Sequence, residues 1–281
     1  MQKREAVRYL VEMHGRPLRR SCECVGLTRS AWYRPLVDWT ERDRELVEEL
    51  TALVENRPSR GLWKCCALLR RRRPEWNHKR IYRVYKGLRL NLRRAVKRRL
   101  PGRERVALYV PRLPDTVWSA DFMSDALACG RRFRTFNVLD DFNREVLHIE
   151  VDTSITSVRL IRIFEQLKQD HCRLPQVLRT DNGPEFLGEA FVEWARTNGV
   201  AIQYIQPGKP NQNAYVERFN RTFRDEVLNQ HLFVRLADVR EAVWWWTLEY
   251  NEERPHESLG DLTPREHSQL AASGSISELS A

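Results

Sequence analysis

Three carboxylates occupy positions on the predicted elements that would allow them to form one site. Asp121 lies in the first predicted strand, Asp181 at the end of the fourth, and Glu217 on the helix after the fifth. Crowded carboxylates raise one another's pKa values unless a multivalent cation neutralises them. Their hard oxygen atoms suit Mg²⁺ or Mn²⁺. Two such ions about 3.5 to 4 Å apart can activate the attacking oxygen and stabilise the leaving oxygen of a phosphodiester displacement. We therefore expect Asp121, Asp181 and Glu217 to be metal ligands and catalytic residues.

The elements that must position these acids begin after Pro114, where the hydrophobic pattern changes from helical to alternating. Three strands joined by short turns predict an antiparallel meander, and alternating helices and strands follow. The expected strands are 116–127, 131–142, 144–153, 175–181 and 200–207, and the expected helices are 154–170, 188–199 and 213–228. This β-β-β-α-β-α-β-α order resembles the RNase H-like fold, a mixed five-stranded sheet with helices on both faces. That fold pairs its first and fourth strands centrally, which would bring Asp121 to Asp181.

The charge of the chain is divided unevenly. Residues 1–115 hold 30 Lys and Arg against 13 Asp and Glu, a net charge of +17, whereas residues 116–281 hold 18 against 25, a net of −7. So strong a concentration of positive charge attracts a polyanion by releasing its counterions, although a solvated basic surface is the plainer interpretation. Nucleic acid is the favoured partner.

The basic half is predicted to be entirely helical. Gly26 separates two short helical stretches in the outline of a helix-turn-helix, and a second two-helix unit spans residues 59–90. In its last helix, Ile81, Val84, Tyr85 and Leu88 fall on one face, and Asn77 is a plausible N-cap. The remaining positions of this helix offer four cations to DNA or simply to solvent: Lys79, Arg80, Arg83 and Lys86.

The chain therefore divides into four predicted regions. An all-α helix-turn-helix-like DNA-binding region occupies 1–100, a basic linker 101–114, the RNase H-like catalytic core 115–230, and a helical extension with a loose tail 231–281. In the extension, one helical face is made by Leu236, Val239, Val243, Trp246 and Tyr250. The tryptophan run 244–246 is expected to pack on the core, with a subunit contact as the second interpretation.

Three stretches together carry a family resemblance: WSADF at 118–122, RTDNGPEF at 179–186 and NAYVERFNRT at 213–222, with 35 residues between Asp181 and Glu217. This set resembles the DDE transposase and retroviral integrase superfamily. It is most similar to the second-frame (orfB) product of bacterial insertion sequence family three. The loop IQPGKPNQN at 205–213 and the tail YNEERPHESLGDLTPRE at 250–266 extend the resemblance over nearly the whole chain.

The resemblance implies cleavage of DNA at the ends of a mobile element and joining of the exposed 3′-hydroxyl to another strand, with Mg²⁺ or Mn²⁺ as cofactor, two ions to a site. It implies element ends and target DNA as partners, a homo-oligomer on DNA, and an upstream-frame (orfA) partner or fusion that supplies a helix-turn-helix and a leucine zipper. Two alternatives stay open: a catalytically inactive DNA-binding regulator, and an RNase H-like nuclease that cuts without joining.

Other residues near the acids are candidates for DNA contact. Gly183 makes a tight turn beside Asp181, and Lys209 could place a cation on a phosphate. Asn213, Asn220 and Arg224 share the helical face of Glu217, and Arg221 is a further candidate for the DNA backbone. The predicted DNA-binding set thus adds Lys209, Asn213, Arg221 and Arg224 to the four cations of the basic helix.

Composition limits the location and the redox chemistry. No apolar run approaches the roughly 18 residues of a membrane span, and the first ten residues lack the apolar centre of a signal peptide, so we expect an intracellular protein. The resemblance implies a cytoplasmic bacterial protein, nucleoid-associated when bound. The six cysteines are expected to be free thiols. A zinc site from Cys22, Cys24, Cys65 and Cys66, with His14 or His78, lacks the usual ligand spacing.

Overall fold

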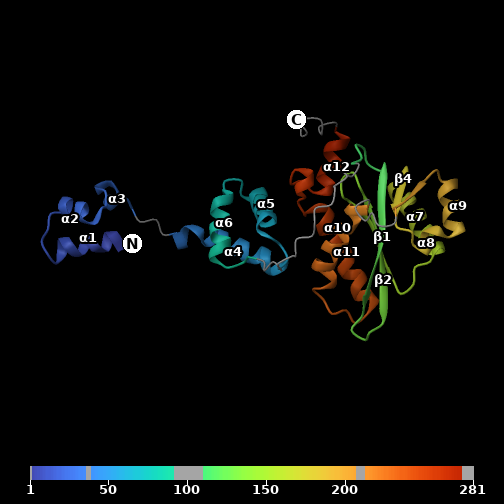
Figure 1. Cartoon of the computed structure of the whole chain (residues 1–281), viewed down its shortest axis with the longest axis horizontal. Coiled ribbons are helices and arrows are strands. Elements are labelled where there is room, and N and C mark those ends of the chain that lie inside the picture. Colours follow the sequence, from blue (N-terminus) through green and yellow to red (C-terminus); the bar gives the residue numbers. More distant parts are fainter. Residues whose placement is uncertain (1, 36–38, 92–109, 207–212, 274–281) are drawn as a thin grey trace. The chain divides into compact units, whose positions relative to one another are not determined.

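The N-terminal unit of the chain, Met1–Thr51, is helical (Figure 1). The computed structural model describes residues 2–35, 39–91, 110–206 and 213–273, so most of the predicted linker 101–114 lies outside the described residues. Gly26 ends one short helix at a φ of +65°, and the side chain of Thr28 caps the next by accepting from the backbone N–H of Ala31 at 3.2 Å. The prediction of two short helices around Gly26 is confirmed. The helices are α1 (Gln2–Glu12), α2 (Leu18–Val25), α3 (Arg29–Tyr33) and the first part of α4 (Trp39–Asn56).

The second unit, Ala52–Ala281, begins near the end of α4 and opens with a pair of helices, α5 (Leu62–Arg72) and α6 (His78–Gly87). Asn77 caps α6 as predicted, because its Oδ1 accepts from the backbone N–H of Lys79 at 2.9 Å. One face of α6 is buried through Ile81, Val84 and Tyr85, and its basic residues occupy the other positions.

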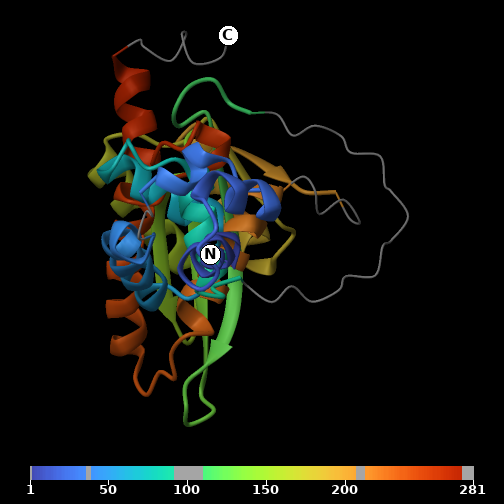
Figure 2. The same ribbon diagram turned by 90° about the vertical axis from the view of Figure 1, so that its left-hand side faces the viewer.

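A five-stranded sheet forms the centre of this unit, with strand order β3-β2-β1-β4-β5. The first three strands make an antiparallel meander, and β1–β4 and β4–β5 are parallel pairs. The β1–β2 hairpin projects beyond the short strands β4 and β5 (Figure 2). The strands are β1 (Val117–Ala126), β2 (Arg132–Asp140), β3 (Val146–Asp152), β4 (Val177–Thr180) and β5 (Ala201–Tyr204). This topology is that of the RNase H-like fold, so the predicted fold class is confirmed.

Helices cover both faces of the sheet (Figure 1). Because side chains alternate along a strand, Trp118 and Ala120 of β1 pack into the core on one face while Met123 packs into the core on the other. The first face carries α7 (Ser157–His171), α8 (Pro184–Leu187) and α9 (Glu189–Thr197). The second carries α10 (Ala214–Phe223), the π-helical turn η2 (Arg224–Leu228) and α11 (Leu236–Glu252).

The C-terminal segment differs from its prediction in two respects. Trp246 is buried against α10 as expected, but Trp244 and Trp245 are 56% and 60% exposed, so the prediction that the whole run packs on the core is wrong. They lie outside the stripe of α11 that faces the sheet. A further helix, α12 (Pro264–Ala272), follows the 3₁₀ turn η3 (Glu257–Leu259) where no helix was predicted. Among the described helices, none combines the length and the apolar composition needed to cross a bilayer.

Candidate active site

The two aspartates of the predicted triad lie at the junction of the central parallel strands. In the β1–β4 pair, Val117 lies opposite Val177 and Ser119 opposite Arg179. Continuing this register by two residues places Asp181, the first residue after β4, beside Asp121. Side-chain alternation puts Asp121 on the sheet face that α10 covers.

The third acid, Glu217, comes from the first turn of α10. The start of this helix is tied to the sheet by Asn213, which is 2% exposed and whose Nδ2 donates to the carbonyl oxygen of Ala120 at 3.4 Å. Asn213 therefore acts in this structure as an anchor of α10 on β1. Burial raises the pKa of Glu217, and the guanidinium of Arg221 partly offsets this effect.

Asp121 lies within electrostatic range of both other acids. Burial, the largest cause, and repulsion from the carboxylates of Asp181 and Glu217 raise the pKa of Asp121 to about 6. The backbone N–H of Phe122 and the side chain of Asn220 oppose this rise by donating hydrogen bonds to Asp121. The structure thus places Asp181 and Glu217 near Asp121, and the catalytic role of the three acids stays a prediction.

A relay of two buried amides holds the carboxylate of Asp121 in place. Asn220, one helical turn after Glu217, donates from Nδ2 to Oδ2 of Asp121 at 2.8 Å. Its Oδ1 accepts in turn from Nδ2 of Asn137 at 2.6 Å, and Asn137 is the residue of β2 that pairs with Asp121. The relay therefore fastens α10, which carries Glu217, to β1 through Asp121 and to β2 through Asn137.

Sequence reasoning placed Asn220 on the face of Glu217 but did not identify Asn137. The signal available in the sequence was the position of Asn137 on the same face of its strand as Phe133 and Leu139, both of which pack into the core. An amide at such a position needs a hydrogen-bond partner.

The turn after β4 explains the glycine and the second acid of RTDNGPEF. A Cβ atom on Gly183 would lie 3.1 Å from Oδ1 of Asp181 and 3.1 Å from Oε2 of Glu185, so a side chain here would have to displace these carboxylates by a few tenths of an ångström. The backbone N–H of Gly183 also donates to Oδ1 of Asp181 at 3.1 Å. Glu185 pairs with Arg134 of β2 and is not available as a fourth ligand. Close packing around Asp181 therefore favours glycine here.

The donor set fits a hard divalent cation, since all three side chains present carboxylate oxygens. As they stand, however, no group of three or more His, Cys, Asp or Glu side chains in the described residues is gathered tightly enough to hold a metal ion. A bound ion would have to draw the three carboxylates closer. The same result gives no support to the zinc site, and all six cysteines are free thiols, as expected.

The predicted DNA-contact residues of α6 lie mostly at the surface. Lys79, Arg83 and Lys86 are exposed, whereas Arg80 is half-buried with its guanidinium 5.6 Å from the centre of the Trp76 ring. A cation–π contact of this kind orients the side chain without neutralising its charge.

The predicted contacts nearer the triad occupy different environments. Arg221 is exposed on α10. Arg224 donates to the carbonyl oxygen of Ser124 at 3.0 Å and lies 3.5 Å from Oδ2 of Asp125, so it fastens η2 to the end of β1. Lys209 lies outside the described residues.

Known proteins resemble both this sequence and this fold. Two family models, each described as Integrase core domain, match residues 111–210 and 198–264. An uncharacterized 39.2 kDa protein of insertion element IS476 from Xanthomonas euvesicatoria is 40% identical over 263 residues, covering 94% of this chain and 75% of the relative. An uncharacterized 31.7 kDa protein of insertion element IS407 from Burkholderia multivorans is 42% identical over 248 residues, covering 88% and 89%.

More distant similarities extend to a transposase and to a solved structure. Transposase InsD of insertion element IS2H from Escherichia coli is 24% identical over 251 residues, covering 84% of this chain and 82% of the relative. The catalytic core domain of HTLV-2 integrase, solved in complex with magnesium, aligns with a TM-score of 0.45 at 20% identity, covering 56% of this chain and 97% of that chain. On the two relatives at 40% and 42% identity and the integrase-core matches, the chain belongs to the DDE transposases of insertion sequence family three.

Proposed function

We propose that this protein cuts DNA at the ends of an insertion element and joins each exposed 3′-hydroxyl to a target strand. The observation that carries the proposal is the approach of the other two acids to Asp121: the β1–β4 register places Asp181 beside it, and burial together with repulsion from Asp181 and Glu217 raises the pKa of Asp121. Three carboxylates held within electrostatic range are a costly arrangement unless a cation is bound there in the working protein.

Asp121, Asp181 and Glu217 would hold the divalent ions, Mg²⁺ or Mn²⁺ and two to a site. Bound there, the ions would neutralise charge on the attacking and leaving oxygens of an in-line displacement. Asn220 keeps Oδ2 of Asp121 oriented, and Gly183 leaves the space that Asp181 needs.

Two displacements at phosphorus account for the reaction. In the first, the oxygen of a water molecule forms a bond to phosphorus and the bond to the 3′-oxygen breaks, which leaves a 3′-hydroxyl and a 5′-phosphate. In the second, that 3′-hydroxyl attacks a phosphodiester of the target, and a new 3′-hydroxyl leaves. Neither displacement needs a covalent link to the protein, which agrees with an acid-only triad.

The basic N-terminal half would bind the DNA. We propose residues 1–100 as the DNA-binding region, 101–114 as a linker, 115–230 as the catalytic core and 231–281 as an extension. The net charge of +17 over residues 1–115 supports this division of labour. The proposed contacts are Lys79, Arg80, Arg83, Lys86, Lys209, Arg221 and Arg224. Asn213 was also predicted to contact DNA, but it is 2% exposed and anchors α10 on β1, so it is not proposed as a contact. A homo-oligomer on DNA and an upstream-frame partner follow from family membership and remain proposals.

An oligonucleotide joining assay tests the function. Wild-type protein, supplied with Mg²⁺ or Mn²⁺ and a duplex carrying the element end, is expected to give joined products. Asp181→Asn should fold but give none, because the substitution removes one carboxylate from the ion site. Asp225→Asn, at an exposed acid on η2, is the matched control and should join normally. Equal joining by wild type and Asp181→Asn would refute the assignment, and cutting without joining would indicate a nuclease.

A further inference from the structure

A large cavity lies on the side of α10 away from the triad and has no role in the proposed chemistry. Its volume is about 1200 Å³, and α5, α10 and the tail after α11 form its walls. Tyr215, Arg218 and Thr222 line it from α10 at helical spacing, whereas Glu217 lies between them on another face. The tail contributes the RPH segment, through Arg254, Pro255 and His256, among others.

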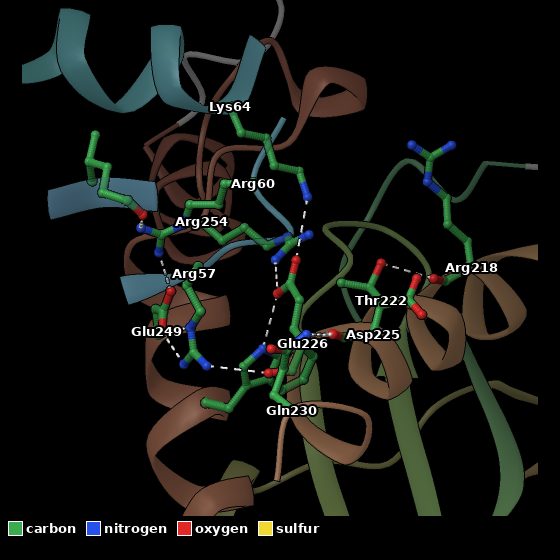
Figure 3. Close-up of polar contacts among 12 residues, drawn as sticks. Arg57, Arg60, Lys64, Arg218, Thr222, Asp225, Glu226, Gln230, Glu249 and Arg254 are labelled. Carbon is green, nitrogen blue, oxygen red and sulfur yellow. Dashed lines mark hydrogen bonds and ion pairs between the residues drawn. The ribbon is translucent and has the colours of Figure 1, made fainter. Parts of the chain in front are cut away.

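The lining of this cavity is strongly basic. Two acids, Glu257 and Asp261, face six cations: Lys64, Arg70, Arg71, Arg144, Arg218 and Arg254. Arg71 pairs with Glu266. The guanidinium of Arg218 extends away from α10 and forms no salt bridge within the described part of the chain (Figure 3).

A single buried carboxylate behind the cavity serves several of these cations. Glu226 of η2 pairs with Arg254, lies 3.8 Å from Nζ of Lys64, and accepts from Nε1 of Trp246 at 3.1 Å (Figure 3). Beside it, Arg57 and Arg60 both pair with Glu249. This network holds the start of α5 against η2 and α11 but leaves the cavity with excess positive charge.

Two buried nitrogen atoms at the cavity have no hydrogen-bond partner in the part of the chain that the structure describes. Nη1 of Arg144 and Nε2 of His256 are both buried without a hydrogen bond among the described residues. Arg144 stacks with its guanidinium carbon 3.6 Å from the centre of the Tyr215 ring. A buried guanidinium nitrogen without an acceptor is costly, so Arg144 favours a ligand that supplies one.

The cations also repel one another. Burial, followed by Arg254, lowers the pKa of Lys64 to about 8, and Arg218 and Arg60 add to this effect while Glu226 opposes it. An anion in the cavity would relieve this repulsion, as DNA phosphates do for basic clefts.

The cavity also offers aromatic surface. Trp63 on its rim is 72% exposed, and Tyr215 and Tyr250 line the interior. Aromatic side chains beside cations are typical of sites for unpaired nucleic acid, because only an unpaired base exposes both faces for stacking. Duplex DNA would meet the cations without using the rings.

We infer that this cavity binds an unpaired DNA strand, with its phosphates on Arg144 and Arg218 and a base against Trp63. The inference deepens the proposed function, on which it rests, by adding a second DNA site across α10 from the triad. An unpaired strand arises wherever an element end frays before joining.

Fluorescence anisotropy with the full chain tests this site. The probe is a labelled single-stranded oligonucleotide, compared with a duplex of the same sequence. The double variant Arg144→Ala/Arg218→Ala is expected to bind the single strand at least about tenfold more weakly than wild type. Its log affinity against log salt should be shallower by about 1.4, the slope expected for two phosphate contacts. The matched control is Arg196→Ala/Arg235→Ala, at two exposed arginines that pair with Glu193 and Asp238, each three residues away in the sequence.

A second pair of variants avoids buried residues. Trp63→Ala is expected to weaken single-strand binding about tenfold, whereas Trp244→Ala, at another exposed tryptophan, should leave it unchanged. Inorganic phosphate at the same phosphate concentration should compete poorly. Strong competition would instead identify a small-anion site.

The outcome separates this inference from the proposed function. Asp181→Asn should bind the single strand like wild type while losing joining. If wild type joins DNA but the double variant binds the single strand as tightly as wild type, the inference fails and the function stands. If the duplex loses as much affinity as the single strand in Trp63→Ala, the preference for an unpaired strand is wrong.

Discussion

The amide of Asn220 provides the sharpest test of how the triad is held. It is 8% exposed, donates to Asp121 at 2.8 Å and accepts from Asn137 at 2.6 Å. Asn220→Ala removes a hydrogen bond to a carboxylate, worth about 1.5 to 3 kcal/mol, and leaves the amide of Asn137 buried without an acceptor, at about 1 to 3 kcal/mol. Because the two losses occur at the same buried side chain and are not additive, we expect the free energy of unfolding to fall by about 2 to 4 kcal/mol.

Denaturant unfolding and calorimetric Mn²⁺ titration, followed by joining rates, measure the two consequences of this change. Asn220→Ala should lower both stability and metal affinity. The double variant Asn137→Leu/Asn220→Leu should recover much of the stability, since neither amide is then left unpaired, but not the metal affinity, since Asp121 still lacks its donor. Asn229→Ala is the matched control, at an exposed amide that donates to Asp225 at 3.4 Å. An Asn220→Ala protein with wild-type stability and metal affinity would refute the positioning role.

Two other substitutions and a change of pH test the contacts around the three acids and around Glu226. Glu226→Gln should lower the free energy of unfolding by about 3 kcal/mol in a denaturant titration, because it leaves Arg254 buried without a counter-charge; a loss below about 0.5 kcal/mol would contradict the network. Mn²⁺ affinity should fall about tenfold per pH unit as the pH drops below about 6, because protonation of Asp121, whose pKa is raised, competes with the ion. Calorimetric Mn²⁺ titrations at several pH values measure this, and an affinity that does not change with pH would contradict it. Gly183→Ala should fold normally by circular dichroism yet bind Mn²⁺ more weakly, since its Cβ would displace Asp181; unchanged affinity would mean that the turn can shift at no cost.

Local patterns predicted the strands, whereas the approach of Asp181 to Asp121 was expected from the resemblance to the RNase H-like fold, which pairs its first and fourth strands. Alternating hydrophobicity marks β1, and Asp181 follows the short apolar strand β4, so the parallel register brings it beside Asp121. Helical periodicity likewise identified the face of α11 that includes Trp246.

What the sequence did not predict depends on contacts between distant elements. The relay through Asn137 joins β2 to α10, and no local pattern marks an amide as a partner of another residue 83 positions away. The cavity likewise needs α5, α10 and the tail assembled together. By contrast, α12 did have a local signal: Thr263 and Glu266 form a capping box, with Pro264 at the first helical position.

The exposed pair Trp244 and Trp245 shows the limit of composition alone. Large aromatic side chains are usually buried, which favoured packing on the core. A helix that lies on a sheet buries one stripe, however, and Val243 and Trp246 already occupy it, so their neighbours point outward.

Anomalous scattering from crystals grown with Mn²⁺ would test the central claim most directly. We predict peaks within about 2.1 Å of carboxylate oxygens from Asp121, Asp181 and Glu217, with the three side chains drawn closer than in the metal-free protein. Mn²⁺ bound elsewhere, or an empty triad at saturating Mn²⁺, would contradict the assignment of these acids as the catalytic metal site.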